Sequence, residues 1–469
     1  MRSRKLAPLT ALLVHVSLVG PGAADEVDRY VEARMRTMRI PGLSLLVVRD
    51  GQVVKSKGYG YADLQHRVPA TPGTVYEIGS NGKQFTAVAV LMLAEEGKLR
   101  LDDPVAKYFP GAPEFWQRIT LAHLLGHTGG IQNHVAVPGY LGAFRTNLFF
   151  EGTPAPDELL KKFFELPKEF EPGQTWAYDN TGFILLGWVI EKVSGMPYWH
   201  FMEERIFRPL GMTATRSTDP RPIVPGRAVG YGWVNGAFEN RAVLWPHVAF
   251  SAGSLLSTVG DLAKWDAALG TERLLRADSW ARAWTAAKAP DGTPLPFDYG
   301  LGWFVESQKG RRYVSHGGGT PGFSSAIHRL VDDRLLVVIL TNHSDMLTDT
   351  LALDIAAIFE PRLRRPSAPR DSDPATTAAH RAVFADLLAG RHDPARFTPP
   401  MALFLSTATG KSFGQWFAEH GEMRSFAFED EERRGDHRFR RYGVVLGETR
   451  YGFSFLVAPD GRIAAVRWW

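Results

Sequence analysis

Apolar and polar positions form short strand-like segments at both ends of one large region of the chain. Residues 43–48 and 53–57 predict the two strands of a hairpin that turns at Asp50-Gly51. Residues 335–340 predict a later strand, so we expect a sheet that joins the N-terminal and C-terminal parts of this region. Residues 75–256 between them are richer in helical periodicity and predict a mostly helical insert.

A long buried helix is predicted from about Ser80 to Glu96, because residues 85–94 are apolar nearly all round. Ser80 and Lys83 form the only Ser-x-x-Lys motif of the chain, although about one such motif is expected by chance. Residues three apart share a helix face, so the amine can reach the hydroxyl. Burial would favour the neutral, basic form of Lys83, which makes the pair a candidate nucleophile and base.

The pattern changes after residue 360. Residues 361–377 mix proline, arginine, serine and aspartate without apolar periodicity, which is typical of a linker. Residues 378–388 predict a helix, and alternating apolar positions between residues 426 and 457 predict strands. A turn at Asp460-Gly461 and a last strand would complete a small C-terminal α+β domain over residues 378–469.

The segment Tyr178-Asp179-Asn180 contains the only Tyr-x-Asn of the chain, on a predicted loop before the apolar helix 183–193. A lysine ammonium nearby would favour the phenolate of Tyr178, which could then shuttle a proton between Ser80 and a leaving group. Asn180 could hold a polar group of a substrate. The alternative is that Tyr178 has a structural role only.

A glycine run, His316-Gly317-Gly318-Gly319, follows a predicted strand at residues 312–315. Glycine within a strand admits close approach of another backbone. The peptide N–H that follows the third position of the run, that of Gly319, could therefore meet a substrate carbonyl oxygen. The alternative is a flexible turn.

In their order and spacing these segments resemble the serine β-lactamase and penicillin-binding-protein-like superfamily, in its branch of class C β-lactamases, D,D-carboxypeptidases and esterases. The resemblance covers most of residues 27–360. Besides the three segments with catalytic candidates it includes four further motifs, His123–Gly130, Phe170–Gly173, Pro209–Met212 and Tyr299–Trp303. It implies a mixed α/β (α+β) fold of the β-lactamase/transpeptidase type, in which helices flank an antiparallel sheet and the active site lies between the sheet and a mostly helical insert.

The resemblance also implies the roles of individual residues. Ser80 would be acylated, Lys83 and Tyr178 would move protons, and Asn180 would position the substrate. The backbone N–H groups of Ser80 and Gly319 would form the oxyanion hole. Gly319 would lie on the strand that carries His316, Gly317 and Gly318.

Three positions depart from the pattern of the superfamily. Gly82 occupies a helical position where glycine costs about 1 kcal/mol relative to alanine. Asp179 replaces the commoner serine and adds an acidic group. His316 stands where penicillin-recognising members usually carry lysine, and a histidine is only partly charged near neutrality. A substrate carboxylate would be held less firmly, which favours a peptidase or esterase over a β-lactamase.

A metal site is not expected. His123 and His127 are four residues apart, but Leu124 replaces the glutamate of a His-Glu-x-x-His site and no third ligand is evident. We expect both histidines to satisfy local backbone groups. No cofactor is indicated by the sequence.

Composition limits the remaining alternatives. With 469 residues, 45% of them hydrophobic and 22% charged, the chain can bury a large core and form more than one domain. The formal net charge of +4, without a basic stripe, argues against a nucleic-acid partner. The chain has no cysteine, so disulfides, a thiol nucleophile and lipidation of a cysteine are excluded.

The first residues predict export. Arg2, Arg4 and Lys5 precede the apolar run 6–20, and small residues follow it, which is typical of a secretory signal cleaved near Ala24. A membrane anchor is the alternative, but the run is short, and no later segment reaches the roughly 20 apolar residues of a spanning helix. We expect a periplasmic or secreted bacterial protein without an integral membrane span.

These observations predict a signal peptide (1–24), a serine hydrolase domain (25–360), a linker (361–377) and a C-terminal domain (378–469) that resembles NTF2-like or cystatin-like modules. The C-terminal domain would stabilise the chain or form a homo-oligomer rather than bind substrate. The expected activity is cleavage of an amide or ester in a small molecule or short peptide through an acyl-enzyme on Ser80. A D-amino-acid peptidase or carboxypeptidase and a carboxylesterase are the favoured alternatives, followed by a β-lactamase and a non-turnover penicillin-binding-like sensor or scaffold.

Overall fold

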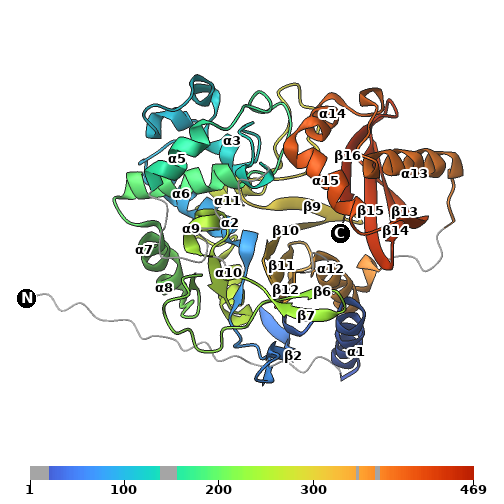
Figure 1. Cartoon of the computed structure of the whole chain (residues 1–469), viewed down its shortest axis with the longest axis horizontal. Coiled ribbons are helices and arrows are strands. Elements are labelled where there is room, and N and C mark those ends of the chain that lie inside the picture. Colours follow the sequence, from blue (N-terminus) through green and yellow to red (C-terminus); the bar gives the residue numbers. More distant parts are fainter. Residues whose placement is uncertain (1–20, 138–155, 244, 345–347, 365–369, 469) are drawn as a thin grey trace, which may run out of the picture.

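A seven-stranded antiparallel sheet forms the centre of the molecule (Figure 1). The computed structural model describes residues 21–137, 156–243, 245–344, 348–364 and 370–468. The strand order is β3-β2-β1-β12-β11-β10-β9. The strands are β1 Gly42–Arg49, β2 Gln52–Asp63, β3 Val68–Pro69, β9 Phe304–Gln308, β10 Arg311–Thr320, β11 Phe323–Leu330 and β12 Leu335–Thr341.

The predicted hairpin and the predicted closure of the sheet are both confirmed. Strands β1 and β2 join at Asp50 and Gly51, whose φ angles of 51° and 77° belong to the left-handed region that a tight hairpin turn requires. Strand β1 pairs with β12 from Leu43 opposite Thr341 to Arg49 opposite Leu335. The centre of the sheet therefore joins segments far apart in the sequence.

Alternate residues of β1 and β12 face two separate cores. On one face, odd-numbered residues such as Leu45 and Ile339 pack with α12 (Thr348–Phe359) and with apolar residues of α1 (Pro21–Met38). On the other face, Leu46 and even-numbered residues of β12 pack with the helical part of the chain, including α2 (Gly82–Glu95) and α10 (Val259–Ala268). The sheet is thus a middle layer between two layers of helices.

The predicted insert is mostly helical. Its α2 is buried nearly all round and packs against α6 (Asn180–Ser194). The other helices in the described part of residues 121–283 are α3 Leu121–Leu125, α5 Pro156–Phe164, α7 Tyr198–Met202, α8 Arg208–Leu210, α9 Pro246–Ala249 and α11 Ala277–Ala283. Short strands β4 Tyr76–Glu77, β8 Leu255–Ser257 and β5 Arg216–Ser217 form a small sheet, and β6 Tyr231–Val234 and β7 Ala237–Asn240 form a hairpin.

The C-terminal region combines helices with a four-stranded antiparallel sheet, as predicted. The strands are β13 Met423–Arg434, β14 His437–Leu446, β15 Thr449–Val457 and β16 Ile463–Trp468. Helix α13 (Pro374–Leu388) begins within the segment expected to be a linker, because Asp373 caps it by accepting a hydrogen bond from Thr376 N. Two further helices, α14 (Pro399–Ser406) and α15 (Ala408–Ala418), were not predicted.

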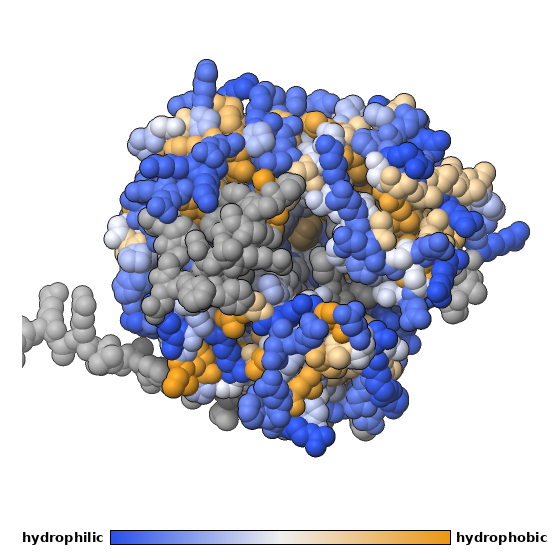
Figure 2. Space-filling model, in the orientation of Figure 1, coloured by the Kyte–Doolittle hydropathy of each residue, from blue (hydrophilic) through white to orange (hydrophobic). Residues whose placement is uncertain are grey.

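The C-terminal region packs beside the helical part of the chain (Figure 1). Figure 2 shows a hollow near the middle of this face, with apolar residues inside it and hydrophilic residues over most of the surrounding surface.

Most of the predicted signal segment, residues 1–20, lies outside the described residues, and Pro21 begins α1. None of the helices in the described ranges is long and apolar enough to cross a membrane.

Candidate active site

Ser80 lies in a tight turn that is held against the sheet. The turn, Gly79–Asn81, is a 3₁₀ turn that leads directly into α2. The Asn81 side chain donates a hydrogen bond to Ser325 Oγ (2.7 Å), and Ser325 Oγ donates one to Ile78 O (2.7 Å). These two bonds fix the serine turn to β11.

Glycines allow β10 to approach this turn closely. Gly79 has a φ of 52°, and a Cβ there would lie 2.8 Å from Gly319 N. A Cβ at Gly318 would lie 1.9 Å from Ile78 O, and a Cβ at Gly317 would lie 2.8 Å from Asp349 Oδ2. A side chain at Gly79 or Gly318 would push β10 away from the serine turn, while one at Gly317 would displace the Asp349 side chain.

The last residues of β10 border the serine turn. Strand β9 pairs with β10 only as far as Ser315 opposite Phe304, while the pairing with β11 continues to Thr320. A Cβ on Gly319 would meet no atom within 4 Å, so space is open there. The backbone of Gly319 and the Ser80 turn therefore lie side by side at the end of the sheet.

Lys83 connects three elements through its amine. Its Nζ lies 3.1 Å from Ser80 Oγ, 2.8 Å from Asn180 Oδ1 and 2.8 Å from Ala252 O. The lysine is fully buried, and burial lowers its pKa well below the usual 10.5, although the nearby Asp179 carboxyl opposes this shift. A neutral amine has two N–H groups and one lone pair. The two carbonyl oxygens can accept the two N–H groups, which leaves the lone pair for the Ser80 hydroxyl.

Tyr178 lies beside this amine and is uncharged. Lys83 Nζ is 4.7 Å from the centre of the Tyr178 ring. Burial raises the pKa of Tyr178, the Asp179 carboxyl raises it further, and only a hydrogen bond with Ser80 acts against these effects. From the sequence, burial was expected to favour a neutral Lys83, while a lysine ammonium was expected to favour the phenolate of Tyr178. Burial lowers the lysine pKa and raises the tyrosine pKa, so these surroundings favour a protonated Tyr178.

Asp179 and Asn180 begin a helix rather than lie within a loop. Asp179 caps α6 by accepting a hydrogen bond from Gly182 N through Oδ2 (2.9 Å). Burial raises the pKa of Asp179 to about 7. Asn180 is the first residue of α6, so the helix directs its side chain amide toward Lys83.

His127 supports Tyr178 and was not singled out as a site residue from the sequence. Its ring centre lies 4.5 Å from that of Tyr178 and 4.7 Å from that of Tyr299. Its Nδ1 accepts a hydrogen bond from Asp179 N (3.1 Å). His123 likewise accepts a bond from Thr120 N through Nδ1 (3.1 Å), so both histidines satisfy backbone groups as expected.

His316 is buried and neutral. Its Nδ1 donates a hydrogen bond to Gly317 O (2.6 Å), so its Nε2 accepts one from the Tyr299 hydroxyl (3.0 Å). Burial and the neighbouring Lys83 lower the pKa of His316 to about 3. An imidazolium that holds a substrate carboxylate is therefore not the state that this environment favours. Tyr299 was quoted only as part of a motif, and the sequence gives no signal for its contact with His316.

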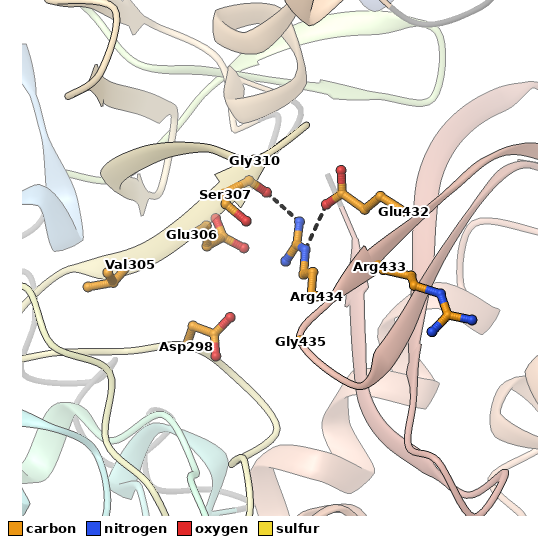
Figure 3. A pocket seen from close by; sticks show the side chains of 9 residues that line it. All are labelled: Asp298, Val305, Glu306, Ser307, Gly310, Glu432, Arg433, Arg434 and Gly435. Atoms are coloured by element: carbon orange, nitrogen blue, oxygen red, sulfur yellow. Dashed lines mark hydrogen bonds and ion pairs between the residues drawn. The ribbon is translucent and has the colours of Figure 1, made fainter.

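A cavity of about 370 Å³ lies apart from these residues, between β9 and the turn that joins β13 to β14 (Figure 3). Arg434 reaches across it and donates hydrogen bonds to Ser307 O and to Glu432 Oε1 (2.7 Å), while Arg433 points away. The described residues contain no group of three or more histidine, aspartate or glutamate side chains that could hold a metal ion.

Residues 27–359 match the sequence profile of the Beta-lactamase family, which is most of the chain. The chain belongs to this family. The resemblance stated from the sequence motifs is thereby confirmed at the level of the superfamily.

Members of this family are similar to the chain in sequence and in structure. Penicillin-binding protein 4* of Bacillus subtilis is 31% identical over 319 residues, which cover 64% of this chain and 68% of that protein. A D-stereospecific amidohydrolase from a Streptomyces species is 28% identical with a TM-score of 0.61, and the match covers 72% of this chain and 98% of that one. The octameric penicillin-binding protein homologue from Pyrococcus abyssi matches 94% of both chains with a TM-score of 0.63 and 24% identity.

The family assignment has two consequences. The chain has the fold of this family, and it belongs to a family of hydrolases. The similarity to the Pyrococcus abyssi protein extends the shared fold into the C-terminal region, because it covers nearly the whole chain.

Proposed function

We propose that the protein hydrolyses a small amide or ester through an acyl-enzyme on Ser80. The observation that carries this proposal is the position of Lys83 Nζ between Ser80 Oγ and two carbonyl oxygens, in a buried environment that lowers the lysine pKa. A buried amine with its N–H groups occupied is suited to accept the serine proton. A scaffold that is never acylated would not need this arrangement.

The acylation step follows from the geometry. Lys83 Nζ takes the proton of Ser80 as Oγ attacks the carbonyl carbon of the substrate. The N–H groups of Ser80 and Gly319 stabilise the negative charge that develops on the carbonyl oxygen. Tyr178 donates its proton to the departing nitrogen or oxygen, and the Lys83 ammonium returns a proton to Tyr178. Water then gives a proton to Lys83 as it attacks the acyl carbon, the bond between that carbon and Ser80 Oγ breaks, the carboxylic acid product leaves, and Lys83 returns the proton to Ser80 Oγ.

A substrate without a free carboxylate is favoured. The position that holds lysine in penicillin-recognising relatives is here a neutral His316, which accepts a hydrogen bond from Tyr299. It offers no positive charge to a free carboxylate. D-amino-acid amides and short D-peptides with an amidated C-terminus are our first candidates, since a D-stereospecific amidohydrolase is among the similar structures. Carboxylic esters are the second, because the same neutral site suits them.

The test uses one purified protein and two variants. A fluorophosphonate probe should label Ser80, and Ser80→Ala should lose both label and turnover, while the exposed Ser412→Ala should keep both. A panel of D- and L-alanine amides, p-nitrophenyl esters and nitrocefin then separates the substrate classes. Preference for D-amides supports the amidase, and preference for esters supports the esterase. Labelling that persists in Ser80→Ala would overturn the assignment, and a preference for nitrocefin would overturn the substrate class.

Export and assembly are part of the same proposal. We propose that the chain is exported to the periplasm or medium and cleaved near Ala24, on the basis of the charged and apolar residues that precede it. N-terminal sequencing of protein recovered outside the cytoplasm should begin within a few residues of Asp25.

A homo-oligomer formed through the C-terminal region is proposed as well, and light scattering of the purified protein tests it.

A further inference from the structure

The segment that carries Tyr178 is held by helices of the C-terminal region. Thr409 Oγ1 at the start of α15 donates a hydrogen bond to the backbone oxygen of Tyr178 itself (3.2 Å). Nearby, Thr175 Oγ1 donates one to Pro400 O of α14 (2.6 Å), and Ala408 N donates one to Glu169 Oε1 (2.6 Å). Three hydrogen bonds thus join the two regions within ten residues of Tyr178.

Apolar packing joins the same two parts. The ring centre of Trp176, two residues before Tyr178, lies 4.3 Å from that of Phe297 and 6.3 Å from that of Phe404 in α14. Phe297 and Phe404 are 5.7 Å apart in an edge arrangement. All three side chains are buried and belong to one hydrophobic cluster. The C-terminal helices therefore complete the core beneath the tyrosine segment.

The tyrosine segment depends on such contacts for its position. Residues 175–179 lie in neither a helix nor a strand, and on the catalytic side they are held by hydrogen bonds from Ala177 N to His127 O (3.0 Å) and from Asp179 N to His127 Nδ1 (3.1 Å). Helix α15 also contacts the turn His134–Ala136. The adjoining Asn133 accepts a hydrogen bond from Asn180 N through Oδ1 (3.3 Å). Helix α15 therefore touches the supports of both Tyr178 and Asn180.

We propose that Thr409 is a positioning residue for proton transfer, through which the C-terminal region sets the place of Tyr178 relative to Ser80 and Lys83. The hydroxyl of Thr409 acts on the backbone of Tyr178 and does not touch the reacting atoms. This inference rests on the proposed role of Tyr178 in the Ser80 reaction. It gives the C-terminal region a part in catalysis, beyond the stabilising or oligomerising role expected from the sequence.

The test compares three substitutions in α15. Thr409→Val keeps the size of the side chain and removes the hydroxyl, Thr409→Ser restores a hydroxyl, and Ser412→Ala is the matched control. Ser412 is exposed and donates its hydrogen bond to Ala408 O (2.7 Å), away from Tyr178. For each protein, kcat and KM on a p-nitrophenyl ester, the rate constant of fluorophosphonate labelling and the melting temperature are measured.

We expect Thr409→Val to lower kcat and the labelling rate about 5- to 10-fold with KM nearly unchanged, as for loss of one partly buried hydrogen bond. Thr409→Ser should recover most of the loss, and Ser412→Ala should match the wild type. If Thr409→Val does not fold, Glu169→Ala, which removes the acceptor for Ala408 N, must lower kcat in the same way or the inference is overturned.

The outcomes separate this inference from the proposed function. Wild-type kcat and labelling in a folded Thr409→Val protein would overturn the positioning role and leave the function of Ser80 in place. An equal loss in Thr409→Ser would also overturn it, because the hydroxyl would then not be the cause. Absence of labelling at Ser80 in the wild type would reject the proposed function, and the inference with it.

Discussion

The amine of Lys83 and the phenol of Tyr178 occupy a site where both are favoured in their uncharged forms. Burial lowers the pKa of the lysine and raises that of the tyrosine. A neutral amine next to a neutral phenol provides a base for Ser80 and an acid for the leaving group without prior ionisation. This protonation pattern is set by the surroundings and cannot be read from the residue types alone.

The pH dependence of turnover should report the lysine. The base form of Lys83 exists above its pKa, and activity should fall as pH falls through that value. Because burial lowers this pKa well below 10.5, an ester should be turned over at neutral pH. Lys83→Met and Tyr178→Phe should each lower kcat by about 10²- to 10⁴-fold. Only Lys83→Met should also lose the acidic limb of the kcat/KM profile. An acidic limb near pH 10.5 in the wild type would contradict the lowered pKa of Lys83.

His316 should not act as a pH-dependent anchor for carboxylates. Its pKa of about 3 keeps the ring neutral from pH 5 to 8. We therefore expect KM for a carboxylate-bearing substrate and for its neutral methyl ester to show parallel pH profiles over this range. A KM that rises with pH only for the charged substrate would show that the imidazolium binds it after all.

At the scale of single residues, the contacts that could be predicted from the sequence were those set by motif spacing. The i, i+3 spacing of Ser80 and Lys83 on a predicted helix was enough to predict their contact, which the structure has at 3.1 Å. The spacing could not predict that Lys83 contacts Ala252 O or that His316 contacts the Tyr299 hydroxyl, because both contacts depend on how distant loops pack. Burial of Lys83 was expected to favour its neutral form, and burial does lower its pKa, but the phenolate expected for Tyr178 is not favoured, because desolvation by the whole fold raises the tyrosine pKa.

The glycines around the serine turn act together to bring three elements into contact. The Cα of Gly253 lies 3.2 Å from the position that a Cβ at Gly82 would take. A Cβ at Gly253 would lie 2.8 Å from Gly79 C and 3.2 Å from Ser80 N. Glycine at position 82 would be costly in an isolated helix. Here it is explained by the close packing of Gly253, the residue after Ala252, against this position.

This packing makes a prediction about substitution with alanine. Gly253→Ala should move the Ser80 turn, lower the rate of fluorophosphonate labelling by at least about 10-fold and destabilise the fold by about 1–3 kcal/mol. Gly260→Ala is the control, because Gly260 is exposed in α10 and a Cβ there would meet only Thr258 Oγ1 at 3.8 Å. It should be neutral or stabilising by up to about 1 kcal/mol. Equal melting temperatures and labelling rates for the two variants would contradict the packing argument.

Elements with strong periodicity were predicted well. The first strand of the hairpin, the turn at Asp50-Gly51, the helix after Ser80 and the C-terminal strands appear within a few residues of their predicted bounds, while β2 runs six residues beyond its predicted end. Helices α14 and α15 were missed, because Pro399-Pro400 and the glycines at 410 and 414 resemble loop residues. In the structure Pro399 starts α14, and a Cβ at Gly410 would lie 2.0 Å from Phe404 O where the two helices pack.

Removal of the C-terminal region should therefore impair the active site. A chain that ends at Arg364 would expose Trp176 and Phe297 and lose the hydrogen bond from Thr409 to Tyr178. We expect poor solubility or at least a 10-fold lower kcat for a small ester, and partial recovery when residues 370–469 are supplied as a separate chain. A soluble, folded truncation with full turnover would show that the helices only cover the site.

Buried histidines and buried carboxyl groups should shape the acid stability of the whole molecule. Burial lowers the pKa of His134 and His316 from 6.5 to about 3, and that of His127 well below 6.5. Below pH 6.5 the unfolded chain binds protons that the folded chain does not, so stability falls by about 1.4 kcal/mol per pH unit for each group. Asp179 and Glu77, whose pKa values are raised to about 7, act in the opposite direction from pH 7 down to about 4.

The balance predicts a shallow decline and then a steep loss. The free energy of unfolding should fall only slowly between pH 6.5 and 5, where the two carboxyl groups offset two of the three histidines. It should fall steeply below about pH 4.5, where the carboxyl groups no longer compensate. Asp179→Asn keeps the helix cap but cannot titrate, so its stability should decline more steeply than that of the wild type between pH 6.5 and 5. Urea denaturation at half-unit pH intervals measures both curves, and a wild-type stability that rises below pH 4.5 would contradict the histidine contribution.

The pairing of β1 with β12 also bears on how the chain acquires its structure. After Arg49 leaves the ribosome, about 290 residues must follow before the partner strand is available, which takes roughly 15–60 s at typical synthesis rates. During this interval the apolar β1–β2 hairpin has one open edge and cannot complete either core. The nascent chain thus remains without its central sheet until Thr341, the last residue of β12, has been synthesised, a condition compatible with threading through a translocation channel in unfolded form.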